Sequence, residues 1–429
     1  MLASMMQPNL DQISGLGGAR SAALARWQAN GWPDAHAESW RFTRLGALVT
    51  RDFVPAIDAG ENNLETGDAL VRPAAEDISA VATQMNAHVI RFYNGMIDVA
   101  SLDGLPGGIT ATHSLDTDFE AIAADVAGLA PADHPVGNLS LAAMSSGLWL
   151  SVEAGMNVEQ PVLLAFEGDG DNVSAHPVMM VDVGIGGAAV IAEWHQSQTG
   201  LSAPLVALRL GDKARLDYAK VQAEGADNVH LAATGIALGE GSVFAGFSIS
   251  AGGQLARLET HVTLTGETAE CNLSAIYLGR DKQHHDITTY MDHAVGHCHS
   301  SQIIRGVLDD ASRGVFQGKV HVAPDAQKTD GQQMSRALLL SRKAEADAKP
   351  ELEIYADDVI CAHGATVGEL DETQLFYLTS RGIPRATARA MLIGAFLDDA
   401  IDVVENAALA GMLRHISDGW MADVKGVSL

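Results

Sequence analysis

The stretch ELEIYADDVICAHGATVGELDE, from Glu351 to Glu372, decides the fold because a β pattern ends and a helical pattern begins inside it. Apolar and polar side chains alternate over its first half, and the alternation restarts in shifted phase before Cys361, which predicts a strand or a pair of strands. Cys361 and His363 stand two residues apart, so a strand presents both on one face. We expect Gly364 to end the strand and the acidic residues after Gly368 to cap a helix.

Upstream of this stretch, from about Val152, short apolar runs recur with Gly, Asn or Asp between them. No regular helical pattern separates the runs, which argues against crossover helices of the βαβ type. The chain has no proline between Pro204 and Pro324, as a long ladder requires when every backbone N–H donates a hydrogen bond. So many short strands fit either a β-sandwich or a solenoid. The even spacing of strands and glycines favours a parallel β-helix.

Both flanks of this β region are predicted to be helical. An amphipathic pattern runs from Ser14 to Asn30, and helical spacing returns from Asp116 to Leu150. Between them, Asn94-Gly95 separates two short apolar runs and predicts a β-hairpin. After Gly368 the pattern is helical, with a break at Arg381-Gly382. We therefore expect three parts: a mainly helical region with a short β segment (1–150), a parallel β-helix (151–366) and a helical domain (367–429).

Composition limits the partners and the compartment. The 429 residues carry a formal net charge of −27, which repels nucleic acid and anionic membrane surfaces. No run of about 18 apolar residues occurs, and the first residues lack the pattern of a secretory leader, so we expect a cytoplasmic protein. The three cysteines, Cys271, Cys298 and Cys361, are far apart and contain no CxxC pair. A thiolate cluster must therefore borrow ligands from histidines, carboxylates or another chain.

Phosphate-binding motifs are incomplete. Gly184 to Ala189, GIGGAA, fits G-x-G-x-x-A, but another strand pattern follows it where a dinucleotide site needs a helix N-terminus. We interpret it as a turn. Gly314 to Lys319, GVFQGK, is shorter than a phosphate loop, and Val320 replaces the Ser or Thr that would meet magnesium. We expect no ATP site on this chain, and no G-x-S-x-G elbow of a serine hydrolase occurs.

Two groups of residues could bind a metal. The region from His284 to His299 is the densest in histidine, and a strand there would place His297 and His299 on one face and Cys298 on the other. A hydrogen-bonded histidine ladder explains the same pattern without a metal, because no carboxylate at fixed spacing completes a site. The second group is Cys361 and His363, two ligands that are too few to hold a metal alone; by residue type alone a buried structural cysteine is the commoner outcome.

Longer segments resemble a known family. They are HHDITTYMDHAVGHCHSSQIIRGVLDDASRGVFQGKVHV (284–322), QKTDGQQMSRALLLSRKAEADAKPELEIYADDVICAHGATVGELDE (327–372), FYLTSRGIPRATARAMLIGAF (376–396), ESWRFT (38–43) and LPGGITA (105–111). Together they resemble the SufB/SufD family of iron-sulfur cluster assembly proteins, and its SufD branch most closely. The resemblance covers essentially the whole chain.

The resemblance implies a right-handed parallel β-helix between helical terminal regions. It implies a non-catalytic scaffold that works with SufB and with the ATPase SufC, which docks on the C-terminal helices. It also implies that Cys361 and His363 face SufB, where a nascent, transient iron-sulfur cluster is built from ligands of both chains. The residue between them is often Ser in the family and is Ala362 here, on the opposite face of the strand. In isolation the chain could also form a homodimer.

Two other functions compete with a scaffold. A β-helix carbohydrate-active enzyme would show paired carboxylates and exposed aromatic side chains along a groove. Only 5% of the residues are aromatic, and no strand shows a clear carboxylate pair, which disfavours this class. A His-based metalloenzyme would centre on His293 to His299. Metal analysis of the isolated chain separates the classes, because a metalloenzyme holds stoichiometric metal and a scaffold retains little iron.

Overall fold

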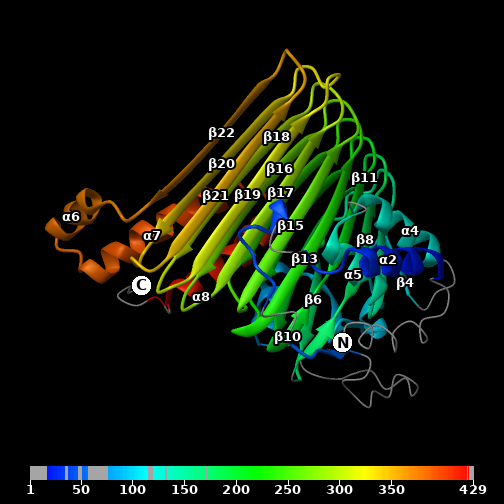
Figure 1. Ribbon diagram of the computed structural model, residues 1–429, viewed down its shortest axis with the longest axis horizontal. Coiled ribbons are helices and arrows are strands. Elements are labelled where there is room, and N and C mark those ends of the chain that lie inside the picture. Colours follow the sequence, from blue (N-terminus) through cyan, green and yellow to red (C-terminus); the bar gives the residue numbers. More distant parts are fainter. Residues whose placement is uncertain are drawn as a thin grey trace.

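Two long parallel β-sheets face each other along the molecule and form a β-solenoid, as Figure 1 shows. The computed structural model describes residues 17–33, 37–46, 51–56, 76–114, 119–130, 133–170, 172–422 and 424. Most strands pair in parallel with the strand two places along the chain, so successive strands alternate between the sheets. The predicted parallel β-helix between helical regions is confirmed.

The twelve-stranded sheet contains a path of nine strands and three strands off that path. In spatial order the path is β21 (Glu345–Ile354), β19 (Arg313–Val322), β17 (His284–His293), β15 (Leu255–Leu264), β13 (Asp227–Leu238), β11 (Leu205–Leu210), β8 (Pro177–Val183), β5 (Ser146–Val152) and β4 (Ile109–His113). The other three are β1 (Val54–Pro55), β7 (Val173–Ala175) and β10 (Thr199–Ser202).

The ten-stranded sheet lies opposite. Its spatial order is β22 (Ile360–Gly368), β20 (Asp330–Leu339), β18 (His299–Leu308), β16 (Glu270–Gly279), β14 (Val243–Ser250), β12 (Arg215–Gln222), β9 (Ala188–Ser197), β6 (Val162–Gly168), β2 (His88–Tyr93) and β3 (Met96–Ile97). Because side chains alternate along a strand, each sheet has an inner face toward the other sheet and an outer face. In β9, Ala189 and Ile191 join the core between the sheets, whereas Val190 and Trp194 point outward.

Helices cover the outer faces of both sheets. Helices α2 (Gly17–Asn30), α4 (Phe119–Leu129) and α5 (Pro135–Ala142) pack on the twelve-stranded sheet. Helices α3 (Glu76–Met85), α7 (Arg385–Ile401) and α8 (Ala407–Ala422) pack on the ten-stranded sheet. Helix α6 (Glu372–Ser380) packs on α7 and lies away from the strands in Figure 1, and two short 3-10 helices are η1 (Glu38–Trp40) and η2 (Val99–Leu102). Within the described residues, no helix combines the length and the apolar character needed to cross a bilayer.

Several local predictions are confirmed. Asn94 and Gly95, with φ of 49° and 77°, form the predicted turn between antiparallel strands β2 and β3. GIGGAA begins as the turn between β8 and β9, where Gly186 has a φ of 64°. The first predicted helix is present as α2, and Ser14 to Leu16 lie outside the described residues. The C-terminal helices also follow the sequence pattern.

Two local predictions are wrong. The helical stretch expected up to Leu150 ends earlier, because its last part is strand β5, which pairs with β4 and β8. Gly364 does not end a strand, since β22 continues to Gly368. A Cβ at Gly364 would lie 2.9 Å from the methyl carbon of Met334, so the glycine lets this side chain lie close to the strand. The sheets also reach beyond residues 151–366, to β2 on one side and to the end of β22 on the other.

Candidate functional site

The solenoid is open at its C-terminal end. Strands β21 and β22 are the last strands of their sheets and have a neighbour on one side only, as Figure 1 shows. Nearly every side chain of β22 is exposed, including Ile360 at 69% and Val367 at 48%. Exposed apolar side chains on an unpaired strand edge are typical of a surface that pairs with another chain.

The two edge strands differ in how well they are protected against pairing with a further strand. β21 contains Pro350, which cannot donate to a further strand, and charged side chains recur along it, with Lys349 paired to Glu38 at 2.7 Å and to Glu351 at 3.2 Å. β22, with the sequence ICAHGATVG, has no proline and no acidic or permanently basic residue. Proline and charge are the usual means of blocking strand addition, so β22 lacks the protection that β21 has.

Cys361 lies at the start of β22, directly opposite Gly331 of β20. Its side chain is half-buried and contacts the end of the core between the sheets. A Cβ at Gly331 would lie 3.4 Å from Sγ, so the glycine leaves space beside the thiol. Burial raises the pKa of the Cys361 thiol, and a hydrogen bond with the Gly331 backbone offsets this only in part. The thiol is therefore protonated at neutral pH, and a metal must displace its proton in order to bind.

His363 lies two residues along β22, opposite Gln333 of β20, and its side chain is exposed. Strand alternation places it on the same face as Cys361, as the sequence predicts. The amide of Gln333 behind it is buried, and neither its oxygen nor its nitrogen has a hydrogen-bond partner. In the part of the chain that the structure describes, no group of three or more potential ligands contains either residue. Cys361 and His363 are thus two potential ligands on one strand, fewer than a metal centre needs.

A family model for "SUF system FeS cluster assembly, SufBD core domain" matches residues 166–396, more than half of the chain. The chain belongs to the SufBD family. An iron-sulfur cluster assembly SufBD family protein of Synechocystis sp. is 30% identical over 403 residues, which cover 89% of this chain and 86% of that protein. SufD of Escherichia coli is 30% identical over 390 residues, covering 88% and 87% of the two chains. SufD of Bacillus subtilis is 35% identical over 159 residues, covering 37% and 36%.

Of the two interpretations of the histidine-rich region of this SufBD chain, the two-histidine metal edge is not formed. His297 has a φ of 60° and lies in the turn before β18, so it is not on a strand with His299. Cys298 is buried, and its thiol donates to the carbonyl oxygen of Gly266 at 3.3 Å. His285 and His293 point into the solenoid, where serine hydroxyls contact their rings. The alternative of a metalloenzyme centred on His293 to His299 receives no geometric support.

The SufBD fold also gathers two clusters that the sequence analysis missed, each with two histidines and one glutamate within 4.8 Å. They are His134, Glu259 and His261, on the outer face of the twelve-stranded sheet, and His195, Glu224 and His230, inside the solenoid. The local signals were a glutamate and a histidine two residues apart on one strand, Glu259 and His261 in β15 and Glu193 and His195 in β9. The remaining members come from other parts of the chain, which no local pattern places beside those strands.

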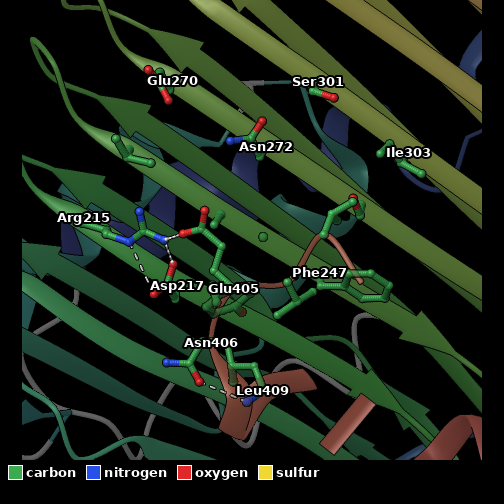
Figure 2. A pocket seen from close by; sticks show the side chains of 17 residues that line it. Arg215, Asp217, Phe247, Glu270, Asn272, Ser301, Ile303, Glu405, Asn406 and Leu409 are labelled. Carbon is green, nitrogen blue, oxygen red and sulfur yellow. Dashed lines mark hydrogen bonds and ion pairs between the residues drawn. The ribbon is translucent and has the colours of Figure 1, made fainter. Parts of the chain in front are cut away.

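A separate pocket of about 320 Å³ lies between the outer face of the ten-stranded sheet and the loop from α7 to α8, as Figure 2 shows. The guanidinium of Arg215 is already paired there, at 2.8 Å with Asp217 and 2.9 Å with Glu405. Glu270 adds another carboxylate to the lining, so acids outnumber the single arginine. The pocket therefore does not offer free positive charge to a phosphate, and neither a thiol nor an imidazole lines it.

Proposed function

We propose that this chain is a SufD-type scaffold subunit of a SUF cluster-assembly complex. It pairs with a SufB paralogue through the open end of its solenoid, and Cys361 and His363 contribute ligands to a nascent cluster shared by the two chains. The ATPase SufC docks on the C-terminal helices, and the chain itself catalyses no reaction. We place this assembly in the cytoplasm.

The unprotected edge of β22 is the observation that carries this proposal. The strand has hydrogen-bonding groups available along its whole free side and exposes Ile360 and Val367. Both candidate ligands lie on this strand, so a partner that pairs with it is brought beside the thiol and the imidazole. A second copy of this chain can use the same edge, so the isolated protein could form a homodimer through it.

Ligand number explains why a partner is needed. An iron-sulfur cluster is held by four protein ligands, commonly cysteine thiolates with histidine as a substitute. Cys361 and His363 supply two, and the paralogue supplies the others. The raised pKa of the Cys361 thiol means that iron and a proton compete for the sulfur. A cluster held by a half-buried thiol and an exposed imidazole at an interface is accessible for release to an acceptor, as a transient product requires.

The docking of SufC is supported by exposed aromatic and apolar side chains on the C-terminal helices. Phe376 and Tyr377 of α6 are 72% and 57% exposed, and Met391 of α7 is 49% exposed. Exposed large apolar side chains are common at protein interfaces. The opposite side of α7, including Ile393 and Leu397, is buried against the solenoid. A movement of SufC can therefore be transmitted to the coils beneath α7.

Co-expression with SufB and SufC tests the proposal. We expect His363→Ala and Cys361→Ala to abolish maturation of iron-sulfur target enzymes in cells while the three subunits still co-purify. His299→Ala is the matched control, because His299 is a solvent-accessible histidine at the start of β18 and lies 3.6 Å from Asp330. Normal activity of target enzymes in the His363→Ala strain would rule out the cluster role of this residue.

A further inference from the structure

The buried cluster inside the solenoid is formed by side chains from both sheets. His195 lies on β9 of the ten-stranded sheet, His230 on β13 of the twelve-stranded sheet, and Glu224 between β12 and β13. Their exposed fractions are 2%, 0% and 4%. One ligand atom from each lies within 4.8 Å of the other two. Two imidazoles and one carboxylate form the ligand set of many zinc and non-haem iron sites.

A second carboxylate holds His195 from behind. Glu193 Oε2 lies 2.8 Å from Nε2 of His195, and Lys220 Nζ lies 3.3 Å from the same oxygen. Because the carboxylate accepts, Nε2 donates its proton, and Nδ1 retains the lone pair of the ring. The His195 ring also stacks on Phe166 at a centroid distance of 4.3 Å, which fixes its orientation. A carboxylate behind a histidine is the usual outer support of a metal ligand.

Several buried atoms of the inner cluster have no hydrogen-bond partner. Nδ1 of His230 lies 3.0 Å from Glu224 Oε2, but out of line for a hydrogen bond, so both ring nitrogens have no hydrogen-bond partner. Glu224 Oε1 has none either. The amide of Gln222 donates to Glu224 Oε2 at 3.1 Å, but no lysine or arginine among the described residues forms an ion pair with Glu224. A buried carboxylate without a fixed counter-charge is costly, and a cation would remove that cost.

The outer cluster provides a useful contrast. There Glu259 already pairs with the Arg257 guanidinium at 2.7 Å, which supplies the positive charge. Nδ1 of His134 accepts the backbone N–H of Gly137 at 2.9 Å, so its Nε2 carries a proton; this nitrogen lies 3.2 Å from Glu259, although it forms no hydrogen bond. His261 Nε2 lies 2.9 Å from the same carboxylate. The outer carboxylate thus has a permanent counter-charge in Arg257, whereas no arginine or lysine among the described residues pairs with Glu224.

We propose that His195, Glu224 and His230 bind one divalent first-row transition metal ion inside the solenoid, of the Zn²⁺ or Fe²⁺ type. This site is independent of the interface function. Five strands separate β9 from β22 in the sheet, so the site lies at least about 29 Å from Cys361 at about 4.8 Å per strand spacing. The ion ties the two sheets together, because its ligands come from both. It must bind as the solenoid closes, since the site is sealed in the folded chain.

Refolding with cobalt tests the site, because Co²⁺ substitutes for Zn²⁺ and absorbs visible light when bound by nitrogen and oxygen ligands. The full chain is unfolded in guanidinium with a chelator, refolded with excess Co²⁺, desalted and analysed for cobalt and for its visible spectrum. We expect one Co²⁺ per chain and a higher melting temperature than that of the chain refolded without metal. The Cys361→Ala/His363→Ala double variant should retain both properties.

Variants distinguish the ligands from their surroundings. His230→Gln should lose the bound Co²⁺ and its spectrum, and Glu193→Gln should weaken Co²⁺ binding by about 10- to 100-fold. His285→Gln is the matched control, because His285 is equally buried inside the solenoid but lies outside the cluster. Circular dichroism verifies that each variant is folded.

Three results would overturn the proposal. The first is a wild-type chain that refolds fully and binds no Co²⁺, in which case a proton on His230 balances Glu224. The second is a folded His230→Gln variant that keeps its equivalent of Co²⁺. The third is loss of Co²⁺ from the Cys361→Ala/His363→Ala variant, which would assign the metal to the open end. Co²⁺ binding by the refolded wild-type chain tests the proposal even if a variant fails to fold.

Discussion

At the N-terminal end of the solenoid each sheet finishes on an antiparallel strand, β3 beside β2 and β4 beside β5, whereas at the C-terminal end both finish on parallel strands. The first end is closed by apolar side chains, with Phe92 fully buried and Ile109 7% exposed. At the other end Ile360 is 69% exposed. The 3-10 helix η2 also covers β2, where the Ser101 hydroxyl accepts the backbone N–H of Arg91 at 3.0 Å.

The closed end of the solenoid contributes to folding stability, and the open end is available for association. A solenoid must stop the addition of further strands at both ends or use the open edge for assembly. Here one edge is closed by a local hairpin, and the other carries the two candidate cluster ligands on an unprotected strand. Substitutions at the closed end should therefore reduce folding stability, and those at the open end should reduce association.

The largest effect is expected at the closed end. Phe92 is fully buried and stacks on Phe166 at a centroid distance of 4.5 Å, so Phe92→Ala should lower the free energy of unfolding by about 3–5 kcal/mol. Val367→Ala at the open end, where the side chain is 48% exposed, should change it by less than about 0.5 kcal/mol. Denaturant unfolding measures both values. Equal losses of unfolding free energy in the two variants would contradict the difference between a closed and an open end.

The second-largest effect is expected from acid, which should lower the free energy of unfolding through the buried His285. Burial lowers the pKa of His285 from 6.5 to about 3, and the charge of His284 contributes. Below pH 6.5 the unfolded chain therefore binds a proton that the folded chain does not bind until about pH 3. Stability from this group is complete above pH 6.5 and falls by about 1.4 kcal/mol per pH unit below it. Unfolding free energies at pH 7.5 and about 5.0 test this, and His285→Gln should reduce the slope.

A smaller effect, on binding alone, is expected at the open edge. Ile360→Lys with Val367→Lys should weaken pairing with the paralogue at least tenfold, about 1.4 kcal/mol, because charge blocks strand addition. Unfolding free energy should stay within about 0.5 kcal/mol of wild type, since both side chains are exposed. Ile185→Lys, at a 63% exposed position in the β8–β9 turn, is the control. Unchanged affinity measured by titration would contradict assembly through β22.

The smallest change in stability is expected on α6. Phe376 is 72% exposed, so Phe376→Ala should change the free energy of unfolding by less than about 0.5 kcal/mol while reducing co-purification of the ATPase. Leu375→Ala provides the contrast. Leu375 precedes Phe376 in the helix and is fully buried, so its truncation should destabilise the fold. Retention of the ATPase by the Phe376→Ala variant would move the docking site away from α6.

The limits of sequence reasoning are visible in two strands. β5 was predicted to be helical, because a short apolar run fits either period and only pairing with β4 and β8 selects the strand. Gly364 was predicted to end β22, since glycine commonly marks a turn. In the structure it lies inside the strand under Met334. Both errors arise where contacts with distant residues override a local preference.

By itself the sequence determined the change from strand to helix near Gly368, the parallel ladder without proline and the common face of Cys361 and His363. These features depend on side-chain alternation, which is a property of a few adjacent residues. Only the tertiary structure decided that β22 has a free edge and that His195 meets Glu224 and His230. Those facts depend on which coils stack and which sheets face each other, and burial of the whole core sets that arrangement.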